Sequence, residues 1–71
     1  MTETEARTLA THQHYKGGLY RVIGTATHSE TRERMTVYEH LWPLDRSMWV
    51  RPADMFEGLL DDGRQRFAAL A

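Results

Sequence analysis

The absence of cysteine is the feature that most constrains what this chain can fold into. A chain of 71 residues buries only about 60% of the surface that its unfolded form exposes, so domains this short often rely on disulfides or metal ions. Without cysteine there are no disulfides, thiolate nucleophiles or cysteine-type zinc sites. The two Trp, three Tyr and two Phe residues must therefore carry much of the core. We expect one small domain of modest stability, with no metal and no cofactor.

The charge balance limits the classes of partner. Nine basic and ten acidic residues give a formal net charge of −1. Binding to nucleic acid or to an anionic membrane surface usually needs an excess of positive charge. The apolar runs are too short to span a membrane, and the acidic segment from Met1 to Glu5 is unlike a signal peptide. We therefore expect a cytoplasmic protein without membrane contacts, for which nucleic acid is a possible partner that the charge does not favour.

Residues 1–11 differ from the remainder of the chain. Thr2 and Glu5 have the spacing of a capping box, and helix-forming residues follow them. We interpret residues 1–11 as an N-terminal tail or a short helix. Residues 12–71 are interpreted as a single small β domain.

Turn-forming residues divide this domain into short segments that favour β-structure. Two glycines, the polar stretch 28–34, the segment that begins at Pro43, and Asp61-Asp62-Gly63 are the expected turns. Gly24 interrupts an otherwise β-rich run and predicts a bulge or a bend in a curved strand. Pro52 suits the start of a helical turn over 53–56. The expected extended segments are 12–16, 19–27, 35–42, 48–51 and 64–70.

This layout predicts a mainly all-β fold. The favoured architecture is a small, strongly bent, five-stranded SH3-like barrel with one short helical or 3₁₀ turn, because closure removes the unpaired strand edges. The alternative is an open antiparallel sheet with a short helix on one face. Phe56 and Phe67 are the expected centre of the core, together with Tyr20, Val22, Val37, Val50, Met55 and Leu59.

A set of motifs in a fixed order resembles a known family. They are His14-Tyr15-Lys16-Gly17, Leu19-Tyr20 with Val22-Ile23-Gly24 and Ala26, His28-Ser29-Glu30-Thr31, Val37-Tyr38, Trp49-Val50-Arg51-Pro52, Met55-Phe56, Gly63 and Arg66-Phe67. Together they resemble the domain-of-unknown-function family 1653. The resemblance implies a small bacterial protein or module, and it implies no particular activity.

The most distinctive polar cluster is His28-Ser29-Glu30-Thr31. In an extended strand His28 and Glu30 point to one side, while Ser29 and Thr31 point to the other. A histidine beside a carboxylate can bind a ligand or act as an acid or base near neutral pH. The structural interpretation is a hairpin whose hydroxyls and carboxylate accept hydrogen bonds from backbone N–H groups.

Exposed aromatic residues form the second candidate cluster. Tyr15, Tyr38 and Trp49 are expected to line a groove, and Arg51 shares a strand face with Trp49. Arginine stacks on rings and binds carboxylates or phosphates through a planar fork. The alternative is that the rings complete the core and Arg51 pairs with a glutamate. Among the histidines, His12 and His40 are expected to face solvent.

The favoured function is a non-catalytic binding module. Its groove would combine the aromatic residues, the polar cluster and Arg51 to hold a peptide, a nucleotide-like ligand or a short single-stranded nucleic acid. One alternative is a small enzyme, whose site a homodimer could build, in which His28 is the acid or base. Another is a structural interaction module with a contact patch at Trp42 and Leu44.

Overall fold

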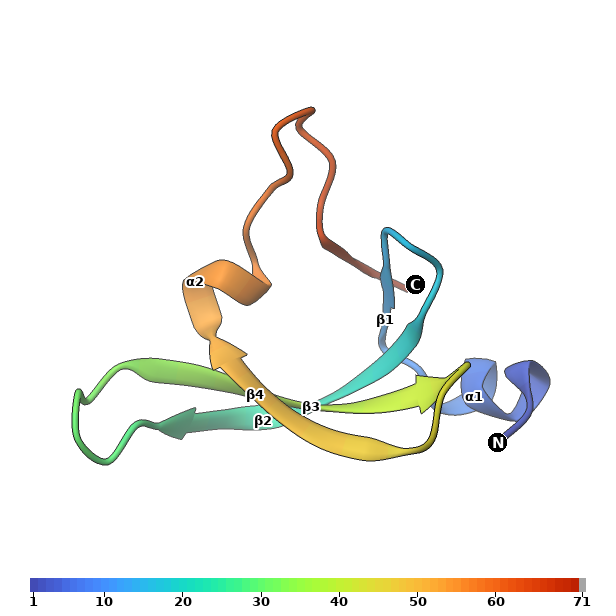
Figure 1. Ribbon diagram of the computed structural model, residues 1–71, viewed down its shortest axis with the longest axis horizontal. Coiled ribbons are helices and arrows are strands. Elements are labelled where there is room, and N and C mark those ends of the chain that lie inside the picture. The colour runs from blue at the N-terminus through green and yellow to red at the C-terminus, as the bar shows by residue number, and fades with distance from the viewer. Residues whose placement is uncertain (71) are drawn as a thin grey trace.

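The computed structural model describes residues 1–70, which form five strands and two short helices (Figure 1). Neither helix in this part of the chain is long and apolar enough to cross a membrane. The elements are α1 (Glu3–Leu9), β1 (His12–His14), β2 (Leu19–Thr27), β3 (Arg34–Trp42), β4 (Ser47–Pro52), α2 (Ala53–Phe56) and β5 (Phe67–Ala69).

The five strands form one open antiparallel sheet in the order β4-β3-β2-β1-β5. Since β4 and β5 are the two edges, the predicted closed barrel is not confirmed, and the alternative of an open sheet with a short helix fits. The sheet bends so strongly that β1 and β5 stand opposite α2 (Figure 1). Closure would need backbone hydrogen bonds between β4 and β5. Few are available, because β5 is short and β4 ends in a proline, a residue that has no backbone N–H.

The concave face of the sheet holds an aromatic core. Its buried members are Tyr38, Phe56 and Phe67, with Tyr20 and Val22 packed against them. The rings of Phe56 and Phe67 stack with centroids 4.2 Å apart and so connect α2 to β5 across the open side of the sheet. The expectation that these two phenylalanines form the centre of the core is confirmed.

Other residues expected in the core are exposed. Val50, Met55 and Leu59 expose 58%, 56% and 61% of their surfaces. Val50 lies on an edge strand, and α2 is a single turn that buries only Ala53 and Phe56. Within residues 1–70 no second layer covers these side chains.

The convex face is covered at one end by α1. Glu5 and Thr2 form the expected capping box, with hydrogen bonds of 2.9 and 3.1 Å. Ala6 is fully buried against Leu19 and Leu41 of the sheet. A helix of seven residues is marginal alone, so this packing stabilises it.

The bulge expected near Gly24 is present. Val22 is paired with Tyr38 and Gly24 with Val37, so Ile23 is the extra residue in β2. A bulge increases local twist and bends the strand. It thus contributes to the curvature that creates the concave face.

Gly17 is a position where a turn requires glycine, because its φ is +102°. We expect Gly17→Ala to lower the free energy of unfolding by about 1–2 kcal/mol, the cost of left-handed backbone for an L-residue. Gly24→Ala is the matched control: a methyl group added at either glycine meets open space, but Gly24 has no positive φ. Urea unfolding of both variants tests this, and equal destabilisation would contradict it.

Candidate functional site

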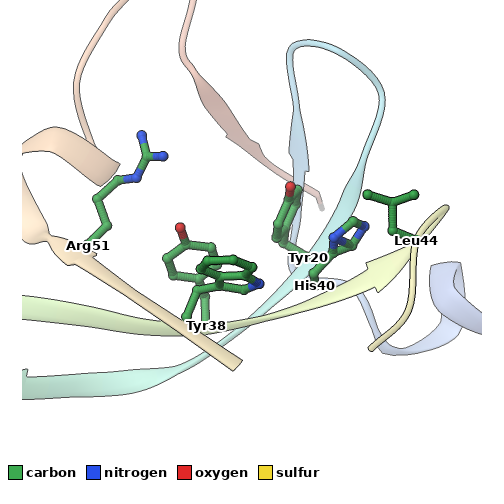
Figure 2. Close-up of a pocket in the computed structure, with 6 residues that line it drawn as sticks. Tyr20, Tyr38, His40, Leu44 and Arg51 are labelled. Carbon is green, nitrogen blue, oxygen red and sulfur yellow. The ribbon is translucent and has the colours of Figure 1, made fainter. Parts of the chain in front are cut away.

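A pocket of about 290 Å³ lies on the concave face, where β2, β3 and β4 meet the loop after β3 (Figure 2). Strand register builds it, since Tyr20 is paired with His40 and Tyr38 with Trp49. Alternation along each strand then places every second side chain on this face. The lining residues are Tyr20, Tyr38, His40, Leu44, Trp49 and Arg51.

Aromatic rings form most of the pocket wall. The ring of Tyr20 lies 4.8 Å from that of His40 and 5.7 Å from that of Tyr38, measured between centroids. Burial raises the pKa of Tyr20, the neighbouring Tyr38 adds to this, and Arg51 opposes it. The Trp49 indole N–H donates to Ser47 Oγ over 2.7 Å, while the residue stays 54% exposed. Trp49 therefore offers ring surface rather than a free donor.

Among the described residues, Arg51 is the only charged one that lines the pocket. Its guanidinium carbon lies 5.6 Å from the centroid of the Phe67 ring. Within residues 1–70 no carboxylate forms an ion pair with it, so the expected alternative of a glutamate partner is not found. Glu39 instead accepts from Arg21 and Arg46, each over 3.0 Å. The guanidinium of Arg51 is thus available to an anionic group.

Positive charge extends beyond Arg51 toward β1. Burial lowers the pKa of His14, and the charges of Arg51, Arg66 and Lys16 lower it further, in that order. All three cations therefore act on the same region beside the pocket.

His40 was expected to face solvent and is instead buried, with 8% of its surface exposed. Alternation from Tyr38 places it on the concave face, where Tyr20 covers it. Its Nε2 is buried and has no hydrogen-bond partner within the described chain. A buried polar atom without a partner costs about 1–3 kcal/mol. Burial lowers the pKa of His40, so the ring is neutral at pH 7.

The segment His28–Thr31 does not line the pocket. It forms the β2–β3 loop, at the end of the hairpin remote from α1 (Figure 1). His28 Nδ1 accepts backbone N–H groups from Glu30 and Thr31 over 3.1 and 3.3 Å. Ser29, Glu30 and Thr31 are exposed. The hairpin interpretation fits: the Thr31 hydroxyl accepts a hydrogen bond from the Glu33 N–H over 3.2 Å, and the imidazole of His28, rather than a carboxylate, accepts the other two.

Tyr15 also lies outside the pocket lining. It is on the β1–β2 turn, with its ring centroid 4.5 Å from that of His14 and cations of Lys16 and Arg64 at 5.7 and 5.9 Å. The structure thus brings together Tyr38, Trp49 and Arg51 of the predicted groove. It adds Tyr20, His40 and Leu44, which sequence reasoning did not assign to it.

Three partly or fully buried histidines predict a pH-dependent stability. Burial lowers the pKa of His12, His14 and His40 in the fold. The unfolded chain therefore binds protons first, from about pH 6.5 downward. We expect the free energy of unfolding to be highest above about pH 7.5 and to fall toward about pH 5.

Urea unfolding across this range measures the effect. The carboxyl of Glu39, whose pKa is lowered mainly by its hydrogen bond to Arg46, affects stability only below its ordinary value of 4.5. Protonation of Glu39 therefore does not contribute to the change in the free energy of unfolding between about pH 7.5 and about pH 5. A free energy of unfolding that is constant or rises as the pH falls from about 7.5 to about 5 is inconsistent with the expectation.

Comparisons with known proteins agree with the motif resemblance. The family model described as "Protein of unknown function (DUF1653)" matches residues 10–69. The crystal structure of a DUF1653 protein from Bordetella bronchiseptica is similar in fold, with a TM-score of 0.76 and 30% sequence identity. That similarity covers 87% of this chain and 85% of the other. No curated protein gives a significant match. The resemblance predicted from the motifs is confirmed, and the chain belongs to the DUF1653 family.

Proposed function

We propose that this protein is a non-catalytic binding module whose pocket takes a flat ring bearing an anionic group. The observation that carries the proposal is the position of Arg51, which lines an aromatic pocket without an acidic partner in residues 1–70. Flat rings stack on aromatic side chains, and guanidinium groups bind carboxylates or phosphates. The pocket therefore matches the two parts of such a ligand.

The size of the pocket narrows the ligand classes. Its 290 Å³ is close to the lower end of the range for small-molecule sites, about 300–1,000 Å³. One ring with its charged substituent fits this volume, whereas an extended peptide or oligonucleotide would place only one side chain or base inside. A binding function is favoured over the alternative in which His28 acts as a catalytic acid or base. The reason is that Nδ1 of His28 already accepts hydrogen bonds from two backbone N–H groups.

The test is a titration with phenyl phosphate, followed by amide and indole NMR signals. We expect saturable shifts at Trp49 and Arg51, with dissociation constants in the range of about 0.1–1 mM for so small a ligand. Arg51→Gln should weaken binding about tenfold, the effect of one lost charged hydrogen bond.

Arg34→Gln is the matched control for the loss of one positive charge. Arg34 is 65% exposed in its side chain, forms a 3.7 Å ion pair with Glu57 and does not line the pocket. It should leave the affinity within about twofold, as expected for an exposed charge. Absence of saturable shifts in the wild type, or equal effects of the two variants, would refute the proposed function.

A further inference from the structure

We infer that the ligand is a nucleoside monophosphate, with the polar edge of its base recognised by His40 and its phosphate held by Arg51. This rests on the proposed function and specifies its ligand class. Figure 2 shows His40 and Arg51 at opposite ends of the pocket, with Tyr38 and Tyr20 between them. A ligand that contacts both ends needs two different polar groups separated by a flat ring.

Strand register gives the span between the two ends. Arg51 is paired with Thr36, which is four residues from His40 along β3. At about 3.3 Å per residue, the two backbone positions are about 13 Å apart. Trp49 and Tyr38 are paired between them, so ring surface lies along the path. A base, a sugar and a phosphate in series suit this span better than a ring with a directly attached charge.

The unpartnered Nε2 of His40 carries the assignment of a polar ring edge. The residue is 8% exposed, and this atom has no partner among residues 1–70. Buried polar atoms are nearly always hydrogen-bonded, so its missing partner requires an explanation. Nucleobase edges carry both N–H donors and N or O acceptors, so they suit either tautomer of a neutral imidazole. A phenyl ring offers neither.

Access to Nε2 requires a change in the pocket wall near His40, where the Tyr20 ring covers the imidazole and Leu44 is the more exposed neighbour in the lining. Leu44 lines the same end of the pocket, comes from the loop after β3, and exposes 71% of its surface (Figure 2). A side chain with so few neighbours changes rotamer at little cost. In the inferred complex Leu44 moves aside and then packs on the outer edge of the base.

The charge of the site agrees with a phosphate group. The pocket lining contains no Asp or Glu, and Arg51, Arg66 and Lys16 all act on His14 beside it. Phosphate oxygens accept a guanidinium fork in a bidentate geometry. A neutral nucleoside would leave Arg51 without a partner and is expected to bind much more weakly.

The experiment compares AMP, UMP, phenyl phosphate and adenosine on the full chain by NMR titration. We expect AMP or UMP to bind at least about tenfold more tightly than phenyl phosphate, and adenosine more weakly than AMP. His40→Phe, which keeps a ring of similar shape, should abolish the preference for the nucleotide over phenyl phosphate. A direct readout in the wild type is the nitrogen chemical shift of His40 Nε2, which should change when AMP is added. This readout does not depend on the folding of the variant.

The outcomes separate this inference from the proposed function. If phenyl phosphate binds in an Arg51-dependent manner but no nucleotide is preferred, or the Nε2 shift does not change, the inference is wrong and the proposed function stands. If neither phenyl phosphate nor a nucleotide binds, the inference and the proposed function are both wrong.

A single-stranded tetranucleotide with a terminal phosphate tests whether the ligand is a free mononucleotide or part of a nucleic acid. It should bind no more tightly than AMP, and tighter binding would overturn the assignment of a free mononucleotide.

Discussion

Phe67→Ala is expected to lower the free energy of unfolding by about 3–5 kcal/mol, the usual cost of removing a buried phenylalanine ring. The ring stacks on Phe56 at 4.2 Å and makes edge contacts with His14 and Tyr20 at 4.9 and 5.2 Å. It thus joins β5 to α2 and to the centre of the sheet. For a domain of this size the expected loss corresponds to a decrease in Tm of roughly 12 °C or more. Thermal unfolding followed by circular dichroism measures it.

Leu59→Ala is the control for this variant. Leu59 is also a large apolar residue of the C-terminal part of the chain, but it is 61% exposed. Its replacement should change stability by no more than about 0.5 kcal/mol. Similar losses for the two variants would show that the Phe56–Phe67 stack does not hold the open side of the sheet together.

Ala6→Glu is expected to have the second largest effect. Ala6 is fully buried against Leu19 and Leu41, so a carboxylate there either lies unsatisfied in an apolar contact or displaces α1 from the sheet. We expect a loss of at least about 2 kcal/mol, or loss of the α1 helix signal by NMR at a similar cost.

Leu9→Glu introduces the same charge into the same helix. Leu9 is 38% exposed, so its carboxylate can remain in water. The expected loss is less than about 1 kcal/mol. If Ala6→Glu is as stable as Leu9→Glu, the packing of α1 contributes nothing, and residues 1–11 act as an appendage to the sheet.

Local sequence signals predicted most of the strands. The segment 19–27 is a strand with the predicted ends, and the segment predicted from 35 to 42 begins one residue earlier, at Arg34. The bulge at Gly24 and the turns at Gly17 and Gly63 were also predictable, because glycine and strand alternation are local properties. The segment 64–70 was less predictable, since only Phe67–Ala69 finds a strand to pair with.

Closure of the sheet and the composition of the pocket depend on contacts between distant residues. No local pattern predicts whether β4 pairs with β5. In the fold these strands are the two edges of the sheet, and the stacked rings of Phe56 and Phe67 connect the open side instead. His40 was missed because histidine is common on surfaces, although its spacing from Tyr38 placed both on one face. The cluster His28–Thr31 was predicted to join the groove from its residue types and from strand alternation, whereas it forms the loop between β2 and β3 and does not line the pocket.

The loop after β3 connects the two faces of the sheet. Leu44 lines the pocket, while two residues later Arg46 forms two hydrogen bonds, of 3.0 and 3.2 Å, with Glu39, whose side chain lies on the opposite face from Tyr38. The Arg46–Glu39 contact, which lies outside the pocket, therefore helps to hold the loop that carries Leu44. Concentrated salt that screens the pair weakens this contact through residues that do not line the pocket. Salt concentration can thus alter the shape of the pocket through an ion pair of residues that lie outside its lining.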